Sequence, residues 1–195
     1  SLESNTVGNE NSAIGFRSLY ENTIGYSNVA IGTKALFSNT IASNLVAIGD
    51  SALFNNGIGV SQSFEARDNV AVGSKSLYSS TIGYMNTAIG SSTLTNNISG
   101  YENTAIGARA LGANQSGWLN TAIGVQAMAF TTTFSNRNTA VGAYAHFVGN
   151  GTGNTAVGFN SLFANNANYN TAIGNEALSA NDFGARNTAI GNRAL

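Results

Sequence analysis

The sequence predicts an all-β solenoid of about 11 coils of 17 residues each, and three observations support this fold class. First, one pentapeptide, usually Asn-Thr-Ala-Ile-Gly with Ser or Val at its second position and Val at its fourth in some copies, recurs along the whole chain. Second, its closing glycines follow one another at intervals of 17, 17, 24, 17, 17, 17, 18, 16, 16 and 17 residues. Third, no apolar stripe with the period of a helix is present. Each unit is therefore expected to form one turn stacked on the next.

Other slots of the unit repeat as well, which defines the expected path of a coil. The third residue after the glycine is small, the fourth is usually Leu, and an Asn is common at the seventh. Glycine, and less readily asparagine, accepts the left-handed backbone of a sharp turn, so we expect these residues at the corners. Stacked asparagines are also expected to hydrogen-bond from coil to coil. Two short strands fit in each coil, and with about 4.8 Å per coil the rod is roughly 50 Å long.

Alternation along the pentapeptide predicts which side chains share a face. The second and fourth positions are β-branched or small, and Val replaces Thr at the second, so we expect this face to be dry and to point inward. The third position is always Ala, which implies a close neighbour on the other face. We expect this neighbour to be a second copy of the chain, although a narrow interior also requires small residues. The alanines assigned to this contact are Ala13, Ala30, Ala47, Ala71, Ala88, Ala105, Ala122, Ala140, Ala156, Ala172 and Ala189.

Composition argues against several function classes. The chain has 8 Lys and Arg against 9 Asp and Glu, so it lacks the basic character of a nucleic-acid-binding protein. No apolar run approaches the roughly 18 residues of a membrane span, so we expect no membrane insertion in this segment. With no Cys and a single His, neither a disulfide framework nor a metal site is expected, and we predict no cofactor.

No catalytic constellation is visible, so an enzyme is not expected. His146 occupies the slot that usually holds Leu, and nothing pairs it with a nucleophile. A hexapeptide-repeat acyltransferase is a remote alternative, because its Ile-Gly step recurs every six residues and here it recurs once per coil. An ice-binding solenoid is a second remote alternative. It is disfavoured because the Thr slot, which becomes Val29, Val46 and Val70 in three copies, is expected to point inward.

The 24-residue interval places seven extra residues within residues 57–68. Residues 59–67 are expected to protrude as a mobile loop, because the coil path is otherwise closely fixed. The segment concentrates polar and aromatic side chains, and loops on rigid scaffolds often carry binding residues. Its candidate receptor or partner contacts are Gln62, Phe64, Glu65, Arg67 and Asp68. A tolerated surface insertion is the alternative interpretation.

Aromatic residues recur in two rows. The candidate surface aromatics eleven residues after the glycine are Tyr26, Tyr84, Tyr101, Trp118 and Tyr169. A second row lies five residues after the glycine and contains Tyr20, Phe37, Phe54, Tyr78, Phe147 and Phe163. Stacking along the rod explains both rows, and a platform for glycans is the alternative.

The motif Asn-Thr-Ala-Ile-Gly-x-x-Ala/Ser-Leu resembles the head repeats of trimeric autotransporter adhesins (the YadA-like head), and even more the repeats of trimeric phage-type tail fibres. The 17-residue period and the Leu after the small residue differ from the adhesin pattern, which places the fibre ahead of the adhesin. The resemblance covers residues 5–195 and implies a left-handed parallel β-roll, a homotrimer, and an extracellular spacer or adhesive role on a virion or cell surface. It implies a glycan or protein receptor and no catalytic residues.

We therefore expect residues 1–195 to form a single repeat domain. Neither end reads as the polar cap that a solenoid needs, so the domain is expected to be a piece of a longer fibre.

Overall fold

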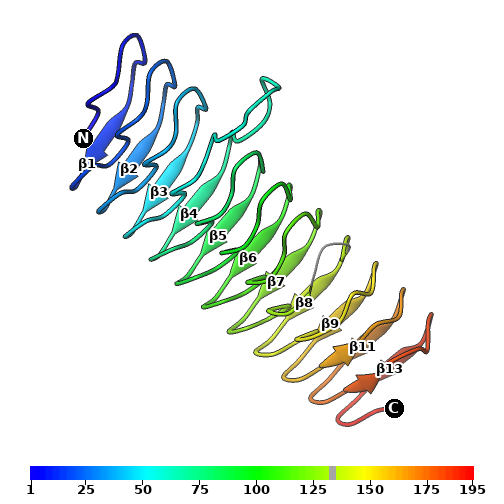
Figure 1. Ribbon diagram of the computed structural model, residues 1–195. Helices are drawn as coiled ribbons and strands as arrows, with labels where there is room; N and C mark the ends of the chain where they lie inside the picture. The colour runs from blue at the N-terminus through cyan, green and yellow to red at the C-terminus, as the bar shows by residue number, and fades with distance from the viewer. Residues whose placement is uncertain (132–134) are drawn as a thin grey trace.

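The chain forms a parallel β-solenoid in the computed structural model, which describes residues 1–131 and 135–195 (Figure 1). The main sheet has eleven parallel strands, one from each pentapeptide, joined by ten turns. These strands are β1 (Ser12–Ile14), β2 (Val29–Ile31), β3 (Val46–Ile48), β4 (Val70–Val72), β5 (Thr87–Ile89), β6 (Thr104–Ile106), β7 (Thr121–Ile123), β8 (Thr139–Val141), β9 (Thr155–Val157), β11 (Thr171–Ile173) and β13 (Thr188–Ile190). Adjacent strands pair in register, as Ala88 does with Ala105, so equivalent slots form rows along the rod.

The wall opposite this sheet contains less regular strand than the sequence predicts. Among the described residues, only β10 (Ala164–Asn165) and β12 (Ala180–Asn181) form a second sheet, which isolated bridges from Phe130 through Val148 to Ala164 extend. The prediction of two strands per coil was therefore wrong for most coils. Turns replace the second strand, and they keep the coil-to-coil hydrogen bonds, such as that from the Leu94 N–H to the Ala110 carbonyl at 3.0 Å.

The corners use left-handed residues that are not glycine. Around β6, for example, Glu102, Arg109 and Leu111 have φ values of 55°, 60° and 50°. Each such residue costs about 1 kcal/mol or more, which the hydrogen bonds between coils must offset. Among the described asparagines only Asn44 and Asn160 have positive φ, so the expectation that asparagine marks the corners was wrong.

Fourteen of the 29 asparagines are buried inside the coil, where they form the ladder that the sequence predicts. The Asn103 side-chain amide donates to the Asn86 side-chain oxygen at 3.0 Å and to the Gly117 carbonyl at 2.8 Å. The Asn103 side-chain oxygen accepts from the Asn120 backbone N–H at 3.0 Å. Buried amides are tolerated here because each finds its partners in the neighbouring coils.

The strand side chains point in the opposite direction to the one predicted. From Ala30 to Ala172 every alanine in the strands of the main sheet is 0% exposed and belongs to the same core cluster as the buried Leu row, for which Leu111 is an example. The β-branched residues instead point outward, and Ile106 is 36% exposed. The assignment of the alanines from Ala13 to Ala189 to a contact between chains was therefore wrong. The narrow interior, which also requires small residues, accounts for them.

The glycine that ends each strand is required by two constraints. Gly107 has a φ of +126°, which L side chains rarely adopt, and a Cβ there would lie 2.5 Å from the carbonyl oxygen of Gly124 in the next coil. The row of glycines thus allows the coils to approach closely at this corner.

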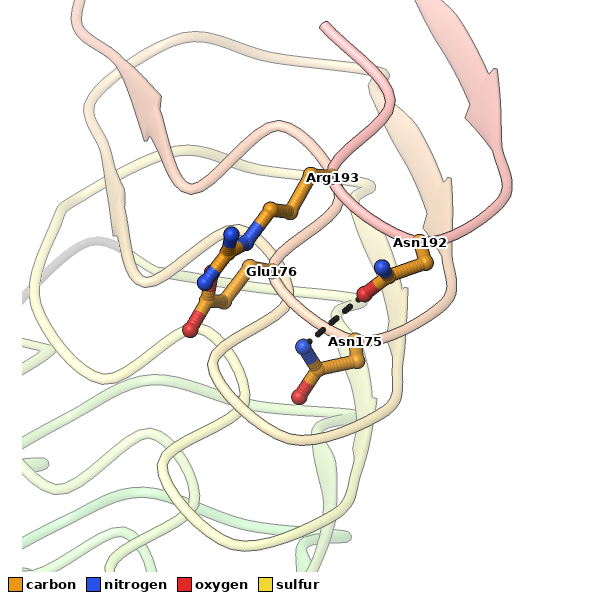
Figure 2. A network of polar contacts seen from close by, with 4 residues as sticks. All are labelled: Asn175, Glu176, Asn192 and Arg193. Carbon is orange, nitrogen blue, oxygen red and sulfur yellow. Dashed lines mark hydrogen bonds and ion pairs between the residues drawn. The ribbon is translucent and has the colours of Figure 1, made fainter.

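Side chains in equivalent outer slots also pair along the rod. Figure 2 shows Asn175 donating to the Asn192 side-chain oxygen at 3.0 Å, beside Arg193 and Glu176, which form an ion pair of 2.7 Å. The Arg193 side chain is 73% exposed, so this ion pair contributes at most about 1 kcal/mol. Outer slots thus tolerate a variety of residues that the interior slots do not.

Candidate functional site

Within residues 1–131 and 135–195, the loop before β4 is the one place where the chain departs widely from the coil path, and it rises beyond the neighbouring coils (Figure 1). The Gly57 N–H still donates to the Thr81 carbonyl at 2.8 Å, and the Ala66 N–H donates to the Ile82 carbonyl at 3.1 Å. The chain therefore leaves the ladder after residue 58 and rejoins it at Ala66, which is fully buried. The predicted protrusion is confirmed, and its mobility stays a prediction.

A carboxylate organises the tip of this loop. Glu65 accepts hydrogen bonds from the backbone N–H of Ser61 at 2.6 Å and of Gln62 at 2.9 Å, and from the Ser61 hydroxyl at 3.2 Å. The backbone hydrogen bond from Ser61, followed by that from Gln62, lowers the pKa of Glu65 below its ordinary value. The ionised carboxylate thus fixes the turn over residues 61–65 although it is exposed to solvent.

Arg67 ties the loop back to the body of the solenoid. Its guanidinium donates to the Ser63 carbonyl at 3.3 Å and to the Tyr26 hydroxyl at 3.0 Å. The guanidinium carbon also lies 5.9 Å from the centre of the Tyr26 ring. Between these two residues the equivalent slot of the intervening coil holds only Ser43. A small residue in a row of large ones leaves space there.

That space is a hollow of about 210 Å³ between the loop and the two preceding coils. Its apolar lining comes from Ile24, Ile41, Ala42 and Val60. Its polar lining comes from Tyr26, Ser43, Gln62, Ser63, Glu65 and Arg67. An aromatic ring, a carboxylate, a guanidinium and an amide therefore converge over an apolar floor, which suits noncovalent binding of a small polar group.

The structure brings together three of the five loop residues predicted as contacts. Gln62, Glu65 and Arg67 line the hollow. Phe64 does not line it, since its ring packs edge-on against Tyr84 with ring centres 5.4 Å apart and is 54% exposed. Asp68 belongs to the coil and accepts a hydrogen bond from the Asn44 side chain at 3.0 Å.

The first aromatic row divides into separate parts. Tyr84, Tyr101 and Trp118 form a continuous stack with ring centres 4.9 and 5.9 Å apart, and the Arg137 guanidinium lies 4.5 Å from the Trp118 ring centre. Tyr26 instead lines the hollow, and Tyr169 lies beside Arg186. The predicted stacking along the rod is confirmed for the three central residues.

Sequence reasoning missed the part that the coil body contributes to this hollow. Ile24, Ile41 and Ser43 come from coils that precede the insertion, so only the fold brings them to the loop. The signal in the sequence was Ser43, because it interrupts a slot that is aromatic in the coils at Tyr26 and Tyr84.

His146 fills the Leu slot in the interior, as predicted. It is 1% exposed, its Nε2 lies 3.4 Å from the Asn165 carbonyl, and its Nδ1 has no hydrogen-bond partner among the residues that the structure describes. Burial is the main cause that lowers the pKa of His146 to about 4. Burial thus keeps this imidazole neutral, and His146 does not line the hollow.

In comparisons with known proteins, no family model matches this chain, and neither a curated protein nor a solved structure matches it significantly. Among the residues that the structure describes, no helix has the length and apolar character needed to cross a membrane.

Proposed function

We propose that this chain is a segment of a trimeric extracellular fibre that spaces and presents a receptor-binding loop. The trimer, its left-handed coils and the phage-type tail fibre as parent assembly are parts of this proposal. The head of a bacterial trimeric adhesin is the alternative parent. A role as an acyltransferase has no supporting feature in the hollow, whose groups suit noncovalent binding.

The single observation that carries the proposal is the row of outward Ile and Val residues on the main sheet. Ile31, Ile48, Ile89, Ile106, Ile123 and Ile173 are all between 36% and 39% exposed, so the row continues with nearly constant exposure along the rod. A continuous apolar strip of this length marks an interaction surface, and parallel sheets are usually covered on both faces.

A second copy of the chain is the partner that matches this strip. It presents the same side chains at the same spacing from coil to coil, so the contacts made at one coil are repeated at all the others. Closed symmetry then buries every copy of the strip, and three rods around a common axis place their strips together at the centre. The loops before β4 would form a ring of three around the outside, which raises avidity for a multivalent receptor.

The test is the mass of the assembly in solution by light scattering. We expect a trimer for the unaltered chain and dissociation for Ile106→Lys, because a charge would be buried in the contact. Ile98→Lys is the matched control, since Ile98 is 46% exposed but lies outside the main sheet. A stable monomer at micromolar concentration would overturn the proposed trimer.

Ice binding is a second candidate. The sequence disfavoured it because the Thr slot was expected to point inward, and in the structure this slot points outward. The second position of the pentapeptide, which is the first residue of each strand, lies on the same side as the outward Ile, and it is Thr in seven consecutive copies. These are Thr87, Thr104, Thr121, Thr139, Thr155, Thr171 and Thr188. Regular rows of Thr and Ile on a flat sheet suit an ordered water surface. Both candidates need the same face, so a monomer that shows thermal hysteresis favours ice binding and a trimer without it favours the fibre.

A further inference from the structure

The second aromatic row is interrupted at three consecutive coils, and the interruption is hollow. Tyr20, Phe37, Phe54 and Tyr78 stack with ring centres 5.1 to 5.3 Å apart, and Phe147 and Phe163 stack at 4.9 Å. In the coils between Tyr78 and Phe147 the same slot holds Thr95, Gly112 and Ala129. A hollow of about 310 Å³ lies over these three residues.

The hollow is built from the same slots of each of the three coils. Thr95, Gly112 and Ala129 stand five residues after the glycine, in the slot that holds an aromatic ring in other coils. The rest of the lining comes from the slots two and six residues after the glycine. The first contributes Ser92, Arg109 and Gln126, and the second contributes Asn96, Ala113 and Phe130. The Phe130 ring packs edge-on against Phe147 with centres 5.0 Å apart, so aromatic rings limit the hollow at this end.

The solenoid itself shows what fits this slot. Wherever the row is filled, each coil holds one flat ring, and the rings lie nearly parallel between Tyr20 and Tyr78 with interplanar angles of 1°, 4° and 15°. Three empty coils extend for roughly 14 Å at about 4.8 Å per coil. The gap is therefore long enough for a guest of about three linked rings that lies along the rod.

The charge of the site selects an anionic guest. Arg109 is the one charged residue among those lining the hollow, and its guanidinium has no hydrogen bond or ion pair to any described residue. Glu102 is the single acidic residue in the sequence between residues 69 and 175. It belongs to the corner before β6 and does not line the hollow. A carboxylate on the guest would gain a charge-assisted hydrogen bond at Arg109.

The rim favours a sugar over an aromatic acid. Ser92, Asn96 and Gln126 place a hydroxyl and two amides around the opening, and none of these side chains is held by another described residue. Such groups match the hydroxyls of a pyranose, while the methyl and methylene surface below matches its C–H face. We propose that this hollow binds a short run of sugar rings that carry carboxylates, as found in acidic polysaccharides.

This inference does not depend on the proposed trimer. None of the lining residues belongs to the main sheet, so the site is complete in one chain whether or not the Ile row is covered. It also differs from the hollow under the loop, which shares no residue with it. If the hollow binds no sugar, the proposal of a trimeric fibre is unaffected. If the chain is a monomer, the proposal for the hollow is likewise unaffected.

The experiment measures binding by calorimetry and by NMR shifts with three probes. Trigalacturonic acid supplies rings and carboxylates, maltotriose supplies rings without charge, and citrate supplies carboxylates without rings. We expect millimolar or tighter binding of trigalacturonic acid, at least about tenfold weaker binding of maltotriose, and none of citrate. Galacturonic acid alone tests whether one ring suffices. Equal binding of trigalacturonic acid and maltotriose, stronger binding of citrate, or no binding of any probe would overturn the proposal.

Variants then localise the binding. Ala129→Phe fills the ring slot as Phe147 does in the next coil, and it should abolish binding while leaving the melting temperature nearly unchanged. Thr95→Tyr is the equivalent change at the other end, next to Tyr78. Arg109→Gln changes an exposed side chain and should weaken binding about tenfold, with a melting temperature close to that of the unaltered chain. Lys75→Gln is the control, because Lys75 occupies the same row as Arg109 but does not line the hollow. Binding that survives Ala129→Phe in a folded chain, or equal losses for Arg109→Gln and Lys75→Gln, would place the ligand elsewhere.

Discussion

The inside and the outside of this solenoid follow different rules. Inside, the strand slot that faces the core holds Ala in every coil, and the facing slot holds Leu with Met128 and His146 as exceptions. Outside, equivalent slots range from a stacked ring to a glycine, as at Tyr78 and Gly112. The interior is closed and only a few side chains wide, so a change in one coil must be absorbed by its neighbours. The outer rows are open, and a missing or added residue there creates a hollow instead of a defect.

Both hollows show this, in opposite ways. Under the loop, the chain adds residues that enclose a space left by Ser43. At Gly112, it lacks the side chains that fill the same row at Tyr78 and Phe147 on either side of the gap. Most residues that line the two hollows lie in outer slots, and the buried Ala42, Ser43 and Ala129 complete the lining. Binding surfaces on this chain are therefore expected where an outer row breaks its own pattern, and substitutions can test this difference between inside and outside.

The largest effect is expected for an interior overpacking change. Ala105→Leu places three extra carbons in a coil where Ala105 and Leu111 are already 0% exposed. We expect a loss of about 3 kcal/mol or more in the free energy of unfolding, measured by chemical denaturation. Ala108→Leu in the same coil is the control, because Ala108 is exposed. Equal stability of the two variants would contradict the inward direction of the strand alanines.

A smaller effect, which depends on pH, is expected at His146. Its pKa is about 4 in the folded chain and 6.5 in the unfolded chain. Between pH 4 and pH 6.5 the unfolded chain therefore binds a proton at His146 that the folded chain does not. Stability is therefore greatest above pH 6.5 and is lost as pH falls toward 4, by about 2 kcal/mol at pH 5.

His146→Leu restores the residue that the slot holds in most coils and removes this titration. Melting curves from pH 7 to pH 4 should show a flatter stability profile for the variant than for the unaltered chain. Parallel profiles would show that His146 is not buried in its neutral form.

The sequence predicts the rows better than it predicts their direction. The coils, the in-register strands, the asparagine ladder and the protruding loop follow from the period and are confirmed. Alternation shows that Thr104 and Ile106 share a face, but not whether that face is inside. A dry β-branched face results either from a core or from an uncovered apolar strip, and an Ala face suits a narrow core as well as a tight contact. The width of the coil decides which face of the strand points inward, and the sequence of one repeat unit does not reveal this width.

The corners were unpredictable for a different reason. Leu111 and Arg109 are residue types that normally avoid positive φ, and here stacking of equivalent turns imposes it. The candidate sites were predictable in part. The loop residues were visible as an insertion, and the gap at Thr95, Gly112 and Ala129 was visible as missing aromatics. That either break forms a hollow depends on distances between coils.

The smallest change in stability, with the largest change in binding, is expected for removal of the loop. Deleting residues 59–65 joins Ile58 to Ala66, and Ala66 then follows Ile58 as Ala42 follows Ile41 in the preceding coil. Ala66 and Ala42 are 0% and 2% exposed, so the join uses a slot that the interior already accepts. The ladder hydrogen bonds at Gly57 and Ala66 lie outside the deleted segment and should persist. We expect the free energy of unfolding to change by less than about 1 kcal/mol and the number of chains in the assembly to stay that of the unaltered protein.

If the loop presents the receptor site, the deletion should abolish binding of the fibre segment to host cells or to a glycan array. Arg67→Ala should weaken binding strongly, because it removes the contacts to Tyr26 and Ser63 that shape the hollow. Phe64→Ala is the matched loop control, since Phe64 does not line the hollow and its loss should have little effect. A marked fall in stability on deletion would make the loop a structural element of the rod, and equal losses for the Arg67 and Phe64 variants would move the contact from the hollow to the outer surface of the loop.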